Sequence, residues 1–524
     1  MEQAEKKSLI GIAGFIPSIF SVRVLGRILG FVRQVLIARY FGASALTDAF
    51  FAVSQVTTML KLLFGVGPLQ TAATTAIINV EVKEGREKAA KILTTYIFNI
   101  AIVASLVLAV LMITSSAWLW RIFPGISGRR ELLNLFYILA PTAILGGIMY
   151  IGSAGLYARH KFIPLEIANI MIPVVAIVFV LVFHVRLSIY SVAFGVLSGS
   201  IIAFGFIFYK LYRGGLIAKA KPSFRGYWSK FLITQGSAAL LFTLWEQIFR
   251  IFERFLASNL AEGMITSLTL AQITVGAAMY LIAQPLSVVS HPILARSYAS
   301  NDMADFRKRF ADVISGAFFA FALLAAILAA TIKPLTFIVF RQGMFSAHAA
   351  LLTASAGKIL AVAVIFQGLY MFLMRVMLAQ KNSSALGRIG FYGWSLAMIA
   401  DVFLAQKLGI VGLAITALAA FALMDVAMIS VIARKSRINM IIVLSSFLKS
   451  ALSSFVTYFF VLTLVRFTVN IFVYGLPSRI MSLLMLFVVG CAGAVFYLVL
   501  SALLKQKEVS IVLDELRKIF ARKR

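Results

Sequence analysis

Charged residues are scarce in this sequence of 524 residues, of which 61% are hydrophobic and only 13% are charged. Soluble chains are nearer half apolar and a quarter charged, so a soluble globular fold is excluded. Cysteine is almost absent: Cys491 stands alone, which excludes a disulfide within the chain and any CxxC metal or redox motif. The four histidines are scattered, and we expect neither a metal site nor a cofactor.

Enzyme signatures are missing as well. The chain contains no GxSxG nucleophile elbow, no HExxH zinc motif and no Walker loop of the form GxxxxGKS or GxxxxGKT. The paired acid and base of a membrane-embedded acyltransferase or glycosyltransferase are not found either. We therefore expect a protein that is not an enzyme and does not hydrolyse ATP.

Acidic residues are outnumbered, with 19 Asp and Glu against 49 Lys and Arg and a net charge of +30. The basic residues form short clusters between apolar runs, a distribution typical of positive-inside topology and not of nucleic-acid binding. Anionic lipid headgroups are the more natural partner. The clusters concentrate at the N-terminus, in alternate loops and in the tail, which predicts that both termini are cytoplasmic. Since no A-x-A-type cleavage site follows the first apolar stretch, we interpret that stretch as a membrane helix.

Apolar runs of about 20 residues, long enough to span a membrane, recur along the whole chain. They predict an all-α polytopic membrane protein with about fourteen transmembrane helices. Glycines and charged residues within the first two spans favour a break or a tilt there. The approximate spans are 9–37, 47–80, 91–118, 132–157, 163–183, 188–211, 228–258, 263–291, 310–338, 349–378, 386–405, 409–433, 444–468 and 480–503.

A long basic loop around residues 209–227 divides six predicted spans from eight. Residues Ala38–Ala49 resemble Ala257–Leu268, at the same place within each half, which indicates a weak internal repeat. Many transporters consist of two such repeats with the substrate site between them. We expect an N-terminal bundle, a C-terminal bundle, two further helices and a basic tail, at 1–215, 216–435, 436–504 and 505–524. The tail is predicted to be an amphipathic helix on the cytoplasmic leaflet; alternatively, it is merely solvated.

Charged residues within the first span are the first candidates for function, because ionisable groups inside a membrane usually face a cavity or a partner. Arg23 and Arg27 stand one turn apart on one face, Arg33 follows, and no carboxylate accompanies them locally. Such a group suits a doubly charged anion such as a pyrophosphate, which guanidinium binds bidentately. Alternatively, Arg33 and Arg39 snorkel to the interface and anchor the helix.

Further charges follow in later spans. Thr47 or Asp48 could cap the second span; alternatively, Asp48 pairs with an arginine in one conformational state. Lys61 lies too deep in that span to act as a cap. The seventh span carries a neutral stripe, which either lines water or exchanges ion pairs as a gate: Glu246, Arg250, Glu253 and Arg254. Single charges in later spans are candidate coupling-ion or proton sites, or else hold the bundle together: Arg375, Asp401 and Asp425.

The segment from Gly26 to Phe51 reads GRILGFVRQVLIARYFGASALTDAFF. It resembles the N-terminal signature of the MurJ-type (MviN) lipid II flippases of the MOP exporter superfamily. Further similarities follow in the expected order at 291–296, 340–345 and 408–414. The resemblance implies two six-helix bundles with two additional C-terminal helices.

Carried over by position, Arg27 and Arg33 match the first-helix arginines that line the central cavity in this family. Asp48 matches the family's acidic residue, and Lys61 falls where the family usually has Arg, so the charge is kept without the bidentate fork. The expected substrate-binding residues are thus Arg23, Arg27, Arg33 and Lys61. The expected gating residues are Asp48, Glu246, Arg250 and Glu253.

Two departures from the family pattern concern the second and eighth spans. The family's Ala-Glu-Gly-Ala-Phe stretch here reads Gly-Val-Gly-Pro-Leu, at Gly65–Leu69. Its Tyr-Ala-Asp-Arg motif falls near Leu270–Ile273, where no cation occurs. One basic side of the cavity is therefore missing.

The resemblance implies a flippase that moves an undecaprenyl-pyrophosphate-linked sugar, lipid II, across a bacterial inner membrane by alternating access. Membrane lipids and cell-wall synthesis proteins are then the expected partners. One alternative is a flippase of another lipid-linked oligosaccharide, such as an O-antigen or exopolysaccharide intermediate. A different alternative is a non-transporting scaffold for wall synthesis, which should tolerate Arg27→Ala. A drug antiporter would favour acidic residues in the cavity, whereas cations prevail here.

Overall fold

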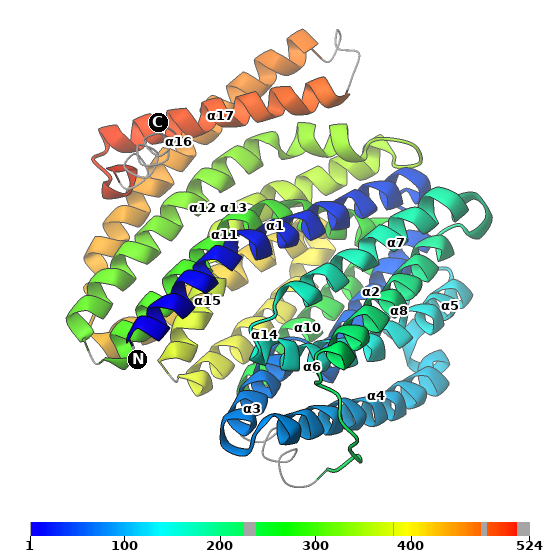
Figure 1. Cartoon of the computed structure of the whole chain (residues 1–524). Helices are drawn as coiled ribbons and strands as arrows, with labels where there is room; N and C mark the ends of the chain where they lie inside the picture. The colour runs from blue at the N-terminus through cyan, green and yellow to red at the C-terminus, as the bar shows by residue number, and fades with distance from the viewer. Residues whose placement is uncertain (1, 225–236, 301, 381, 473–478, 511–524) are drawn as a thin grey trace. The chain divides into compact units, whose positions relative to one another are not determined.

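The computed structural model describes residues 2–224, 237–300, 302–380, 382–472 and 479–510. Every regular element in these ranges is a helix (Figure 1), as the apolar runs predict. The helices are α1 Glu2–Phe41, α2 Ala45–Phe64, α3 Pro68–Glu84, α4 Arg86–Ile122, α5 Arg129–Leu139, α6 Pro141–Ala158, α7 Ile163–Leu187, α8 Tyr190–Arg213, α10 Ser237–Ser258, α11 Met264–Ala299, α12 Met303–Phe340, α13 Ala347–Ala379, α14 Ser383–Leu408, α15 Ile410–Ser436, α16 Met440–Phe472 and α17 Arg479–Leu503.

Twelve stretches of described helix are long and apolar enough to cross a membrane. Two of these stretches join a pair of helices, α2 with α3 and α5 with α6. Helices α1 and α10 lie where the sequence predicts two further spans. The all-α polytopic class is confirmed, and the helices agree with about fourteen spans.

The second span is broken between α2 and α3. Gly65 and Gly67 adopt φ values of 152° and 75°, which side-chain-bearing residues rarely adopt, and Pro68 starts α3 where no N–H is needed. A Cβ on Gly65 would also lie 2.6 Å from the carbonyl oxygen of Gly147 on α6. The first departure from the family pattern is therefore the break itself. The first span, by contrast, is one uninterrupted helix, α1.

The chain forms two compact units, called unit 1 and unit 2 below. Unit 1 comprises Met1–Thr266 and Gly343–Phe345, and unit 2 comprises Ser267–Gln342 and Ser346–Arg524. The division falls within the first turn of α11. The boundary that the basic loop suggests, at 215/216, stays a prediction.

Small residues allow the helices of unit 1 to approach closely. A Cβ on Gly195 of α8 would lie 2.6 Å from the Cα of Ala176 on α7, and one on Gly199 would lie 2.8 Å from the Cα of Ile172. Such close backbone contact is typical of membrane helices. Helix α7 also packs along α1, and α6 packs against α2, α3, α4 and α8. Helices α6 and α7 thus place their side chains beside those of α1 and α2.

In unit 2, α12 packs against α13, α16 and α17. The Tyr497 hydroxyl of α17 donates a hydrogen bond to the Phe319 carbonyl of α12, at 3.1 Å. Helices α13 and α14 both pack against α15, where the rings of Tyr370, Trp394 and Phe421 meet edge to face. The two C-terminal helices, α16 and α17, therefore pack against the rest of unit 2 through α12.

The loop after α8 is tied to α4 by side chains that bind its backbone. Asn99 donates to the carbonyl of Ser223 at 2.6 Å and accepts from its N–H at 3.1 Å. Thr94 accepts from the N–H of Ala218 at 3.1 Å. Most of the predicted amphipathic tail falls at 511–524, outside the described residues, so that interpretation stays a prediction.

Candidate functional site

Arg23 of α1 pairs with an acidic residue that lies far from it in the sequence. Arg23 forms an ion pair with Glu166 in the first turn of α7, with Nη2 and Oε1 2.6 Å apart. Arg23 Nε donates to the same oxygen at 2.7 Å. Glu166 is the sole Asp or Glu between Glu131 and Glu246, a signal that could have singled it out. Of the predicted binding residues, Arg23 is therefore already neutralised.

Polar side chains of α6 and α7 extend this group. The Tyr150 hydroxyl donates to Asn169 Oδ1 at 3.3 Å, and Tyr150 interacts electrostatically with Arg23, Arg27 and Glu166. The Arg27 side chain is exposed. Hydroxyl, amide and guanidinium groups thus gather on neighbouring helices of unit 1, an arrangement suited to a polar and anionic ligand.

Arg33 and Lys61 come together from α1 and α2. Their charges are near enough to repel each other, and neither belongs to an ion pair within the described residues. The stem of Lys61 runs across α6: its Cγ would lie 3.3 Å from a Cβ on Gly146. Arg33 Nε is buried and has no hydrogen-bond partner in the described part of the chain. Two adjacent cations without an acid are an arrangement suited to an anion.

Asp48 binds the start of another helix. Its carboxylate accepts from the N–H groups of Gly263 and Thr266, at 2.7 and 2.8 Å, and from the Thr266 hydroxyl at 2.6 Å. In return, Glu262 Oε1 accepts from the N–H of Ala45 at 2.9 Å. The starts of α2 and α11 therefore cap each other.

The mutual cap brings together equivalent residues of the two repeated segments. Thr47 and Thr266 occupy equivalent positions in the repeated segments, and their hydroxyl oxygens lie 3.0 Å apart. The N-cap of α2 itself is Ser44, whose hydroxyl accepts from the N–H of Thr47. Of the two residues that the sequence offers as a cap, Thr47 takes part, since its hydroxyl accepts from the N–H of Ser44 at 2.8 Å, and Asp48 does not cap its own helix. An ion pair of Asp48 with an arginine in another conformational state stays a prediction.

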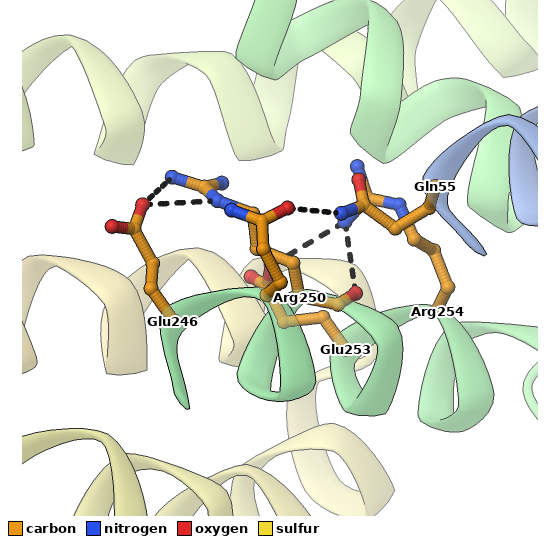
Figure 2. A network of polar contacts seen from close by, with 6 residues as sticks. Gln55, Glu246, Arg250, Glu253 and Arg254 are labelled. Atoms are coloured by element: carbon orange, nitrogen blue, oxygen red, sulfur yellow. Dashed lines mark hydrogen bonds and ion pairs between the residues drawn. The ribbon is translucent and has the colours of Figure 1, made fainter. Parts of the chain in front are cut away.

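The charged stripe of α10 forms a network with α2 (Figure 2). Arg250 pairs with Glu246 at 2.9 Å, and Arg254 lies 3.5 Å from Glu253 while also donating to the carbonyl of Arg250 at 3.1 Å. Gln55 of α2 donates to Gln247 of α10 at 2.9 Å. Glu253 and Arg254 are 1% and 5% exposed. The stripe is thus self-compensated in this state, and its gating role stays a prediction.

The three single charges of later spans belong to unit 2. Asp401 and Asp425 are almost fully buried, on α14 and α15. Neither oxygen of the Asp425 carboxylate has a hydrogen-bond partner among the described residues. Arg375 lies on α13. Their proposed part in ion or proton coupling is untested.

A comparison with known protein families finds a family model that matches most of the chain. A family model described as lipid II flippase MurJ matches residues 37–485. A probable lipid II flippase MurJ of Buchnera aphidicola subsp. Schizaphis graminum (strain Sg) is 25% identical over 352 residues, covering 65% of this chain and 67% of the relative. The lipid II flippase MurJ of Burkholderia cenocepacia is 22% identical over 369 residues, covering 67% and 68%.

Solved structures agree in fold. A lipid II flippase MurJ in an inward closed conformation superimposes with a TM-score of 0.76 at 21% identity, covering 93% of this chain and 98% of that one. An inward-facing multidrug resistance MATE transporter of the MOP superfamily gives 0.63 at 13% identity, covering 80% and 95%. The described helices therefore have the fold of this transporter superfamily.

Proposed function

The chain belongs to the MurJ family of lipid II flippases, multi-pass membrane transporters, and from that premise we propose that it moves lipid II from the cytoplasmic to the outer leaflet by alternating access. The cationic pair Arg33 and Lys61 carries this proposal, because it offers an anion site inside the membrane spans of unit 1. The pyrophosphate of lipid II is the group that would bind there. Its polyprenyl chain would stay in the bilayer.

Each cation has a distinct part in this proposal. Arg33 would bind two phosphate oxygens side by side, whereas the Lys61 ammonium would act as a point charge. Arg27, one turn and a half before Arg33 on α1, would receive the anion from the exposed side. Arg23 would position Arg27 and Tyr150 through its pair with Glu166.

Cations of α10 would supply the positive charge that the eighth span lacks. Leu270 and Ala271 of α11 are buried and apolar, whereas α10 carries Arg250 and Arg254 next to α2. Their partners Glu246 and Glu253 neutralise them here. Release of these pairs when cargo enters would supply the second basic side, which is how the stripe would act as a gate.

The mutual cap of α2 and α11 would open and close during the cycle. Three donors meet the Asp48 carboxylate in this state. Separation of the two helix starts would break these bonds together, so the contact has two discrete arrangements. The predicted bundles 1–215 and 216–435 would rock about it, with 436–504 as additional helices.

Membrane topology follows from the basic clusters. We propose that both termini lie in the cytoplasm of a bacterium whose inner membrane holds the protein, because basic residues concentrate around the junction of α3 with α4 and after α6 and α8. The membrane potential is worth about 2.3 kcal/mol per charge per 100 mV, so it would return an empty, positively charged carrier toward the cytoplasm.

A vesicle assay tests the function. The purified full-length protein, reconstituted with a fluorescent lipid II analogue, should make the internal analogue accessible to an external reagent. Arg27→Ala and Lys61→Met should abolish this, while Lys407→Met, in the last exposed turn of α14, should not. Unchanged flipping by Arg27→Ala and Lys61→Met would support a scaffold instead. Flipping that persists after the potential and every ion gradient are collapsed would contradict the resetting step.

A further inference from the structure

Two lysines lie within the membrane-spanning helices of unit 2 and are not used by the proposed site in unit 1. Lys333 belongs to α12 and Lys358 to α13, and both side chains are exposed. Charged side chains inside a membrane are costly unless they meet water, a partner or an ion. Their surroundings therefore indicate what they bind.

The two lysines lie at the same depth. A Cβ on Gly357 of α13 would lie 2.9 Å from Cγ1 of Ile332 on α12, so these two residues are level with each other. Lys358 and Lys333 are the next residues along each helix. Lys358 is about 16 Å along α13 from Ala347, too far for its helix end to account for it.

The Lys358 ammonium lies by the ring of a tyrosine on α16. Its Nζ lies 5.4 Å from the centroid of the Tyr458 ring on α16. Helix α16 runs parallel to α12, because Ser454 binds the carbonyl of Ala322 and Val461 packs with Ala330. The backbone of Tyr458 therefore lies about 7 Å from the level of Lys358, on the side away from the end of α12 at Phe340.

Neither lysine has an acidic counter-ion in the described part of the chain. Helices α13, α16 and α17 contain no Asp or Glu, and neither lysine forms an ion pair within the described ranges. Asp312 of α12 lies about 20 Å from the level of Tyr458 along the helix. The contact of Tyr370 with Phe421 places Asp425 more than about 20 Å from Lys358 along α13. Asp401 of α14 is 0% exposed and pairs with neither lysine among the described residues, so an anion from outside the chain could serve as their partner.

We propose that Lys333, Lys358 and Tyr458 form a second phosphate site, in unit 2, which receives the pyrophosphate of the lipid-linked cargo during translocation. This rests on the proposed function, which supplies the lipid-linked phosphate that would reach the site. The site can hold a charged phosphate because two ammonium groups act as point charges there. The Tyr458 ring holds the Lys358 ammonium while the site is empty.

Binding of undecaprenyl pyrophosphate to the purified full-length protein in nanodiscs tests the site. Lys358→Met should weaken binding about tenfold, the effect of losing one charge-assisted contact. Lys358→Arg should bind within about threefold of the unaltered protein, because it keeps the charge. Lys407→Met is the matched control and should bind normally. Equal affinity of the Lys358→Met and unaltered proteins would overturn the site.

Two further measurements separate the other outcomes. If Lys358→Met lowers the thermal midpoint without ligand and leaves the affinity unchanged, the contact with Tyr458 only joins α13 to α16, and the proposal fails. If Lys358→Met reduces binding of phosphatidylglycerol but not of undecaprenyl pyrophosphate, the site takes a membrane phospholipid and the cargo assignment is overturned. Lys61→Met tests the proposed function separately. If Lys61→Met weakens binding and Lys358→Met does not, the second site is ruled out and the proposed function stands. No binding by the unaltered protein would instead remove the proposed function.

Discussion

Asp48 of unit 1 and Asp425 of unit 2 are both carboxylates buried inside membrane helices, at 3% and 2% exposure. Asp48 accepts three hydrogen bonds at the start of α11, whereas neither oxygen of Asp425 has a partner in the described part of the chain. A buried carboxylate with donors fixes two helices together, and one without donors costs free energy. The first carboxylate joins two helix starts in this state, and a role of the second in ion or proton coupling stays a prediction.

Individual cations of the two units show a similar contrast. In unit 1, Arg23 pairs with Glu166 and Arg250 pairs with Glu246, and each carboxylate fixes the position of its arginine. Among the described residues, Lys358 of unit 2 meets the face of Tyr458 and no carboxylate. Arg33 and Lys61 of unit 1 likewise form no ion pair there, and they are the residues we assign to the cargo.

The largest expected effect concerns Arg33 and Lys61. Arg33→Gln combined with Lys61→Met should reduce flipping of lipid II in vesicles by about a hundredfold or more, because two charge-assisted contacts to the pyrophosphate are lost. The thermal midpoint should rise or stay unchanged, since two repelling charges disappear. A variant that flips normally would show that unit 1 uses other cations.

Asp48→Asn should produce the largest loss of stability. The amide would present a donor to the N–H groups of Gly263 or Thr266, leaving at least one of them unsatisfied, at a cost of about 2–3 kcal/mol. Denaturant unfolding in mixed micelles measures this free energy. Glu262→Gln keeps the acceptor for the Ala45 N–H and should cost less. Equal losses in the two variants would mean that burial of Asp48 does not matter.

Glu166→Gln should have a smaller effect, because Arg23 is about a third exposed and water partly screens the pair. We expect a loss of about 1 kcal/mol in unfolding free energy. Arg23→Gln added to Glu166→Gln should restore part of it, as in a double-mutant cycle. Strictly additive losses would show that the pair is not coupled.

Asp425→Asn should have the smallest effect and the opposite sign. Since no hydrogen bond of Asp425 is lost, the unfolding free energy should stay the same or increase by less than about 1 kcal/mol. The same unfolding experiment compares it with Asp48→Asn. A loss as large as that of Asp48→Asn would remove the distinction between the two units.

Sequence alone predicted the helices well because membrane spans are encoded in local runs of apolar residues. The positions of the spans, the break near Gly65 and the Glu246–Arg250 pair all depend on residues close together in the chain. Partners that come from distant helices were missed. Glu166 meets Arg23 across 143 positions, and Asp48 meets Thr266 across 218, so neither contact leaves a local signal.

The internal repeat is the one long-range signal that the sequence held. It paired the segments around Thr47 and Thr266, and these two threonines lie side by side. A repeat predicts equivalent places in two halves, but it does not predict that those places touch. The contact between these two places comes from the mutual capping of two helix starts, which depends on the backbone and on Asp48 and Glu262.

Depletion of the protein in its native host, followed by a sidedness assay of lipid-linked wall precursors, tests the central claim most directly. The account predicts that lipid II accumulates on the cytoplasmic leaflet, that cells lyse, and that the Arg33→Gln, Lys61→Met variant fails to rescue them while Lys407→Met succeeds. Normal translocation of lipid II after depletion, with accumulation of a surface-polysaccharide intermediate instead, would contradict it.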